Sequence, residues 1–138
     1  MIFGNKETLD SKTTPLLRTG TVSSVDKEKA TVKVFFEDRD ESTSGDLRVV
    51  TKNTMHKKMY WMPEVDEQVL CLFDPRGEED GYVIGSIYSD VDKSPADIDK
   101  SKVDTWGIWF DDKNYIYFDD KEKQFVVGHQ NPVKWVDT

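Results

Sequence analysis

The sequence has little cysteine, no long hydrophobic run and fewer cations than carboxylates. A single cysteine among 138 residues rules out an intrachain disulfide, so the fold is not a cystine scaffold. No segment approaches the ~20 apolar residues of a transmembrane helix, and the N-terminal residues lack the apolar run of a signal peptide. We therefore expect a protein that is made in the cytoplasm and that leaves, if it does, by another route.

The charge balance and the missing motifs argue against nucleic-acid binding and against catalysis. The net charge is −8, from 27 acidic and 19 basic residues, and such a field repels a polyanion. One basic cluster, made of Lys52, His56, Lys57 and Lys58, is interpreted as a solvated loop. There is no Ser-His-Asp arrangement, no Gly-rich phosphate loop and no pair of metal ligands, and we expect Cys71 to be a buried apolar group. We expect neither an enzyme nor a bound cofactor.

Five short segments have the alternating or continuous hydrophobicity of β-strands, and residues typical of turns separate them. A longer connection lies between the third and the fourth, which matches the OB-type layout of a five-stranded barrel. We therefore predict an all-β protein with an OB-fold-like five-stranded barrel over residues 16–90. The predicted strands are Leu16–Val25, Ala30–Phe36, Leu47–Thr51, Glu67–Phe73 and Gly81–Ser89.

A change in composition separates this barrel from a second apolar region. Residues 91–102 are polar, contain Pro95 and hold almost no apolar side chains, as is typical of a linker. Residues 103–138 are apolar again, and we expect a short C-terminal β meander there. Residues 1–15 are polar and end at Pro15, so we interpret them as an N-terminal arm or a short helix.

The sequence Phe-Asp-Asp-Lys occurs twice in the second region, at Phe110–Lys113 and Phe118–Lys121. Paired carboxylates can be catalytic acids, calcium ligands or turn residues. The strand between the copies, Asn114–Phe118, separates the two carboxylate pairs by roughly 15 Å at ~3.3 Å per residue, and the Gly-containing loop of a calcium site is missing. We therefore interpret both copies as turns of an antiparallel meander.

Large apolar side chains occupy both faces of the predicted meander, with Tyr115 and Tyr117 on the face opposite Ile116 and Phe118. A three-stranded sheet of this kind is not stable alone in water. Either it folds back onto the barrel as additional strands, or copies of the chain bury one another's aromatic residues. The polar linker favours the second alternative.

Two segments of the sequence resemble a known family. They are GTVSSVDKEKATVKVFF and, after the strand LRVVT, the stretch YWMPEVDEQVLCLFDPRGEEDGYVIGSIYSD. Both are similar to the baseplate assembly protein V and the VgrG-type spike proteins of contractile phage tails and related injection systems. The resemblance covers about Leu16 to Asp90, with a weaker similarity over residues 106–128. It implies an OB-fold barrel followed by strands that intertwine three chains into a needle.

From this resemblance we expect residues 103–138 to form an intertwined trimeric β-prism or β-helix. The implied function is that of a structural central spike, which plugs the tail tube and leads it through the target envelope. Residues 1–15 would then be the docking arm on the tail hub. The expected trimer interface consists of Trp106, Ile108, Phe110, Ile116, Phe118, Phe125 and Val127.

The resemblance also implies partners and a location. The expected partners are the other copies of a homotrimer, the tail hub and tube, and further baseplate proteins, with transient contact to the target envelope. Assembly is expected in the bacterial cytoplasm, into a virion or a phage-tail-like particle. The C-terminal part is shorter than in many relatives, so a separate tip protein is a further candidate partner. Some relatives bind iron through His-x-His, whereas the C-terminal part of this chain has a single histidine, His129, which would bind a metal only if three copies met on an axis.

An OB-type barrel that binds single-stranded nucleic acid is the alternative function. Trp61, Tyr60 and Phe35 would stack on bases, and the lysines of the basic cluster would contact phosphates. Tyr60 and Trp61 are better explained as residues that plug the barrel core. The acidic total also opposes this function.

Overall fold

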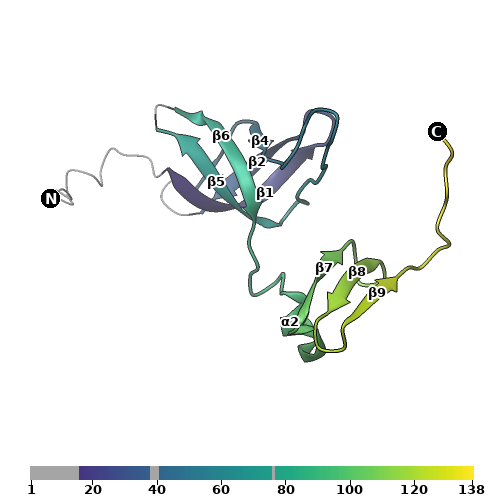
Figure 1. The fold of residues 1–138 in the computed structure, drawn as a ribbon. Coiled ribbons are helices and arrows are strands. Elements are labelled where there is room, and N and C mark those ends of the chain that lie inside the picture. The colour runs from purple at the N-terminus through teal and green to yellow at the C-terminus, as the bar shows by residue number, and fades with distance from the viewer. Residues whose placement is uncertain (1–15, 38–40, 76) are drawn as a thin grey trace, which may run out of the picture. The chain divides into compact units, whose positions relative to one another are not determined.

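The computed structural model describes residues 16–37, 41–75 and 77–138. The arm expected over residues 1–15 lies outside the described residues. The chain divides between Asp92 and Lys93 into two compact units, and Figure 1 colours the first from purple to teal and the second from green to yellow. Each unit contains a β-sheet of its own.

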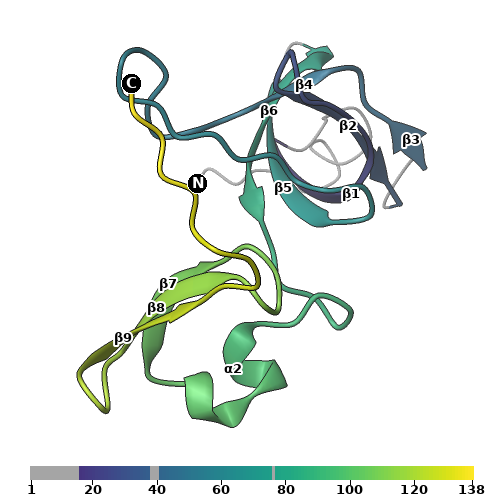
Figure 2. The same cartoon turned by 90° about the vertical axis from the view of Figure 1, so that its right-hand side faces the viewer.

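The first unit is a closed barrel of five strands with one short additional strand, and in Figure 2 these strands form a ring. The strands are β1 (Leu17–Asp26), β2 (Thr31–Phe36), the additional β3 (Ser42–Thr43), β4 (Leu47–Val49), β5 (Gln68–Asp74) and β6 (Gly77–Ser86). The sheet closes into a barrel because β1 pairs with both β2 and β5. β6 pairs with β5 and, in parallel, with β4, which in turn pairs with β2. The predicted all-β, OB-fold-like five-stranded barrel is confirmed.

The inward-facing residues of the barrel follow the period-two pattern of the sequence. Val32, Val34 and Phe36 of β2 are buried, whereas Lys33 between them is exposed. Phe36 meets Phe73 edge to face, with ring centroids 5.6 Å apart. Each such side chain contributes about 1.5–3 kcal/mol on full burial, so this unit has a core of its own. The core consists of Val22, Val32, Val34, Phe36, Leu47, Val69, Cys71, Phe73 and Val83.

The second unit contains a three-stranded antiparallel meander. β7 (Thr105–Trp109), β8 (Tyr115–Asp119) and β9 (Gln124–Gly128) pair in that order. Among the described residues these strands make a sheet separate from the barrel's. The alternative in which they extend the barrel as further strands is therefore wrong.

The segment interpreted as a linker contains regular structure that its polar composition does not predict. α2 (Pro95–Ile98) and η1 (Lys100–Lys102) lie directly before the meander. The Ser94 hydroxyl accepts a hydrogen bond from the backbone N–H of Asp97 at 3.1 Å, and Pro95 occupies the first turn. A serine followed by proline is typical of a helix N-terminus, so a local signal for this short helix was present in the sequence.

Candidate functional site

The strand register of the meander places six of the seven predicted interface residues on one face. Residues directly opposite one another on neighbouring strands point to the same side of a sheet. One cross-strand row consists of Trp106, Phe118 and Phe125, and the next consists of Ile108, Ile116 and Val127. The seventh residue, Phe110, is exposed and directly follows the last residue of β7. These seven residues are called the apolar face below.

The apolar face is open to solvent within one chain. Trp106 is 78% exposed and Phe125 is 77% exposed. Only Phe118 is half-buried, and it contacts Phe125 edge to face with ring centroids 5.0 Å apart. Aromatic residues are enriched where one protein binds another, and a large contiguous apolar patch is unusual on a soluble monomer. The face therefore has the character of a binding surface.

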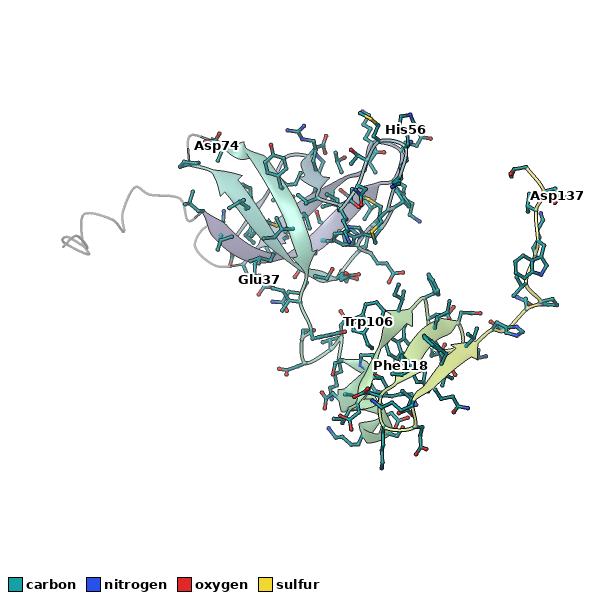
Figure 3. All side chains as sticks on the ribbon, viewed as in Figure 1. Glu37, His56, Asp74, Trp106, Phe118 and Asp137 are labelled. Atoms are coloured by element: carbon teal, nitrogen blue, oxygen red, sulfur yellow. The ribbon has the colours of Figure 1, made fainter. Side chains whose placement is uncertain are left out.

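The opposite face of the meander is covered by residues of its own unit. Tyr117 is buried, and the ring of Trp109 stacks on it with centroids 5.3 Å apart and planes at 10°. Tyr115 lies against Tyr117 at 5.6 Å, and the Lys102 ammonium lies 5.4 Å from the centroid of the Tyr117 ring. The sequence predicts that both faces of the meander are uncovered, whereas on this face the neighbouring side chains cover part of the aromatic surface. Figure 3 labels Trp106 and Phe118 on the unit.

Two glycines allow the tyrosine rings to lie close to the sheet. A Cβ atom on Gly107 would lie 2.3 Å from the Cβ of Tyr117, and one on Gly128 would lie 2.4 Å from Cζ of Tyr115. Both distances are shorter than atoms can approach, so any side chain there would displace a tyrosine or the backbone. The missing side chains of the two glycines thus leave space on this face of the meander, which the tyrosine rings of the same unit occupy.

The two Asp-Asp-Lys copies form turns, as the sequence predicts. Asp111 Oδ1 accepts hydrogen bonds from the backbone N–H groups of Lys113 at 2.8 Å and Asn114 at 2.7 Å. Asp119 Oδ1 accepts from the backbone N–H groups of Lys121 and its successor, at 3.0 and 3.1 Å. The bond from the Lys113 N–H is the main cause that holds the pKa of Asp111 below its ordinary value. These carboxylates are therefore occupied as turn acceptors.

The described residues contain no group of three His, Cys, Asp or Glu side chains placed to hold a metal ion. His129 Nδ1 lies 3.0 Å from the carbonyl oxygen of Asn131 in the same chain. One chain supplies only this histidine near the end of β9. A site shared by three copies of His129 stays a prediction.

The three aromatic residues considered for base stacking have different environments. Trp61 is half-buried against the core and donates its indole N–H to the Val50 carbonyl at 3.0 Å, so it is part of the barrel structure. Tyr60 is 68% exposed and donates its hydroxyl to the Lys27 carbonyl at 3.2 Å, so the interpretation of Tyr60 as a core plug is wrong. Phe35 is half-buried on β2. Across the part of the chain that is described, the ring contacts join none of the three.

Cys71 and the acidic residues before β5 have structural environments. Cys71 is fully buried, and this burial raises the pKa of its thiol to about 12, so the reactive thiolate does not form at neutral pH. Glu67 accepts hydrogen bonds from the backbone N–H of Glu64 at 3.1 Å and from the Ser86 hydroxyl. These bonds tie the turn before β5 to the end of β6 and do not arrange a nucleophile with a base.

The barrel carries the decisive similarity to known proteins. Residues 18–88 match the family described as the Type VI secretion system/phage-baseplate injector OB domain. The chain belongs to this family. The matched residues are just over half of the chain and comprise the closed barrel with its loops. No curated protein matches the chain.

Membership in the injector OB domain family makes the chain a component of a phage baseplate or a Type VI secretion system. It also implies association with other proteins of that assembly, in a virion or a comparable particle. The domain that defines the family is a structural one. Among the described residues, no helix is long and apolar enough to cross a membrane. The match ends before the meander, so the role of the apolar face rests on its own physical chemistry.

Proposed function

We propose that the chain is the structural central spike of a contractile phage tail or a related injection particle. Three copies join through the apolar face, and the resulting spike plugs the tail tube and leads it through the target envelope. The observation that carries this proposal is the apolar face itself, because its exposed area is too large for a solitary soluble chain.

The size of the apolar face supports burial by other copies. Six of its residues are at least 50% exposed: five of the six residues in the two cross-strand rows, and Phe110 directly after β7. At ~150–250 Å² for a large side chain, these six expose roughly 700 Å² together, whereas the largest apolar patch of a typical monomer is ~300–600 Å². The surplus favours an oligomer.

A trimer disposes of this surface and of the free strand edges together. In the proposed β-prism, each copy turns its apolar face to a common axis, so that like residues meet like residues around the axis. The outer edges of β7 and β9 would pair with or be covered by neighbouring chains, which removes the unpaired backbone groups that make sheet edges prone to aggregation. Continuous pairing between chains would also resist the axial force on a spike.

The remaining partners follow from the place of a spike in its particle. Residues 1–15 would dock on the tail hub and the end of the tube, next to other baseplate proteins. A separate tip protein would complete a spike whose C-terminal part is this short, and contact with the target envelope would be transient. Three copies of His129 near the axis would offer imidazole ligands to a metal ion at the end of the meander.

Truncation before Val103 tests this proposal. The barrel has its own core, so residues 1–102 are expected to fold, with a β-sheet circular dichroism spectrum, and to sediment as a monomer where the full chain is a trimer. A chain that ends at residue 131 keeps the apolar face and is the matched control, which should remain trimeric. If residues 1–102 stay fully trimeric, the apolar face is not the main assembly element.

A further inference from the structure

One segment of this acidic chain is cationic, and the proposed spike makes no use of it. Residues 47–63 contain no aspartate or glutamate, although the chain has 27 such residues. Among the described residues, no ion pair joins a lysine of this segment to a carboxylate. The charges of these lysines are therefore open to a partner molecule. The cations of the segment are Arg48, Lys52, Lys57 and Lys58.

Residues 52–60 of this segment form a projecting hairpin, called the finger below. The Thr51 hydroxyl donates to the Met59 carbonyl at 2.7 Å, and the Met59 N–H donates to the Asn53 carbonyl at 3.2 Å. An isolated β-bridge also joins the two arms. Every residue of the finger is exposed, and Figure 2 shows the finger as a loop that extends from the barrel. The finger is thus a defined structure that is open to a partner on all sides.

The finger lines a cationic hollow of about 470 Å³. Two ammonium groups, an imidazole, an amide and a hydroxyl lie around it, and the described residues that line it include no carboxylate. An ammonium group pairs with phosphate as a compact point charge, and the neutral polar groups can donate hydrogen bonds to the same oxygens. The hollow therefore suits a phosphate group. Its lining consists of Lys52, Asn53, Thr54, Met55, His56 and Lys57.

The same finger exposes apolar groups beside these cations. Met55 is 76% exposed, Met59 is 54% exposed and Tyr60 is 68% exposed. Thioether side chains are flexible and adapt to irregular apolar surroundings, and a tyrosine ring suits a boundary between an apolar and a wet region. Lysine stems lie along apolar surface while their ammonium groups stay in water. The partner that matches both halves of the finger presents anionic phosphates with an apolar layer directly beneath them.

A phospholipid surface fits this combination better than a protein or a nucleic acid does. Arginine is enriched and lysine is depleted where proteins bind one another, and the finger has lysines without an arginine. Nucleic acid that is bound without sequence preference stacks its bases on several aromatic rings. The finger offers the single ring of Tyr60, because the adjacent Trp61 is half-buried and donates its indole N–H to the Val50 carbonyl.

The acidic total of the chain does not cancel the local charge of the finger. Electrostatic interactions between exposed charges are screened over ~8 Å at physiological ionic strength. The arm from Lys52 to Met55 can extend up to roughly 13 Å at ~3.3 Å per residue. A lipid surface at the end of the finger therefore meets its lysines first, whereas a strand of nucleic acid laid along the barrel would meet the carboxylates.

We propose that the finger binds the surface of a membrane that contains anionic phospholipids. Lipid phosphates lie in the cationic hollow and beside Lys58, while Met55, Met59 and Tyr60 enter the boundary between headgroups and acyl chains. The contact is reversible and non-covalent. It gives the barrel a lipid-binding activity that the spike proposal does not require, and it does not depend on the number of copies in the assembly.

Cosedimentation of the full chain with vesicles tests the cationic half of the finger. The vesicles contain phosphatidylcholine alone or equal parts of phosphatidylcholine and phosphatidylglycerol, and we expect binding to the second kind only, weakened by added salt. Each lysine near an anionic surface contributes about fivefold, so Lys57→Gln with Lys58→Gln should lower the partition coefficient roughly 30-fold. The matched control, Lys113→Gln with Lys121→Gln, removes the same charge from exposed residues of the meander turns and should bind nearly as the parent does.

A fluorophore on the finger tests its apolar half. Met55→Cys, labelled with an environment-sensitive fluorophore, should shift its emission to shorter wavelength on the anionic vesicles. Lys93→Cys carries the same label on an exposed residue of the other unit and should not shift. Cys71 is fully buried and stays unlabelled in the native chain. Circular dichroism verifies that each labelled chain is folded, and equal shifts at both positions would overturn insertion of the finger.

Failure of lipid binding and failure of the spike proposal give different results. A trimer that binds neither kind of vesicle, or both equally, overturns lipid binding by the finger and leaves the apolar face intact. A monomer that binds anionic vesicles through Lys57 and Lys58 supports lipid binding and overturns the trimer. Equal loss in the two lysine double variants overturns the finger as the site. Binding of a single-stranded oligonucleotide without binding of vesicles overturns the lipid proposal and assigns the finger to nucleic acid.

Discussion

Replacing Phe125 by alanine tests the apolar face at its most exposed phenylalanine. Phe125 is 77% exposed in one chain, and the ring of Phe118 is its aromatic contact. Burying a whole phenylalanine side chain contributes ~1.5–3 kcal/mol, so burying the exposed three quarters contributes about 1–2 kcal/mol per copy. Three copies would lose about 3–6 kcal/mol of trimer stability, which corresponds to about 10²–10⁴-fold in the dissociation equilibrium.

Sedimentation equilibrium over a range of concentrations measures this change, and far-ultraviolet circular dichroism verifies that the variant chain is folded. The matched control is Gln124→Ala, because Gln124 is also exposed on β9 but is adjacent in the strand and so points to the opposite face. We expect the control to dissociate as the parent does. If Phe125→Ala and Gln124→Ala have the same dissociation equilibrium, the apolar face is not buried in the assembly and the reasoning is refuted.

Three further predictions concern single residues. Gly107→Ala places a Cβ 2.3 Å from that of Tyr117 and should lower the melting temperature and the near-ultraviolet signal of the stacked rings, whereas unchanged values would contradict the packing of that face. Asp111→Asn should change the melting temperature little at pH 7, because an amide oxygen accepts the same turn hydrogen bonds. The pKa of Asp111 is lowered from its ordinary 3.8, so its contribution to stability is present above pH 3.8 and is lost as the pH falls through the lowered pKa. An acid titration of the stability of parent and variant measures this loss. Cys71, whose pKa is raised from 9.0 to about 12, should react with a thiol reagent at pH 8 only after unfolding, and rapid reaction of the native chain would show that the thiol is exposed. The stability of the fold should also fall as the pH rises from 9 towards 12, because only the unfolded chain then loses the thiol proton.

The barrel could be predicted from the sequence because local and long-range signals agree there. Alternation along β2 separates the buried Val32, Val34 and Phe36 from the exposed Lys33, and turn residues set the limits of each strand. Strand β6 begins at Gly77, four residues before its predicted start, because pairing with β5 continues into a charged stretch that lacks any hydrophobic pattern. Pairing partners, rather than side chains, decide where such a strand begins.

The residues of the apolar face could be predicted from the sequence, whereas the difference between the two faces of the meander could not. Period-two alternation is sufficient to place Ile116 and Phe118 on one side of β8. It cannot reveal that Trp109 of β7 stacks on Tyr117 of the neighbouring β8 or that Gly107 leaves room for the Tyr117 ring, because these contacts depend on the strand register. The basic cluster of Lys52, Lys57 and Lys58 was visible in the sequence, whereas the hydrogen bonds that make its segment a hairpin exist only in three dimensions.

The mass of the full chain in solution tests the central claim most directly. Sedimentation equilibrium at micromolar concentration should give a single species of about 48 kDa, which is three copies of the 16.0 kDa chain. A species of 16.0 kDa at that concentration, with a folded circular dichroism spectrum, would show that the chain keeps its apolar face exposed alone and would contradict the account.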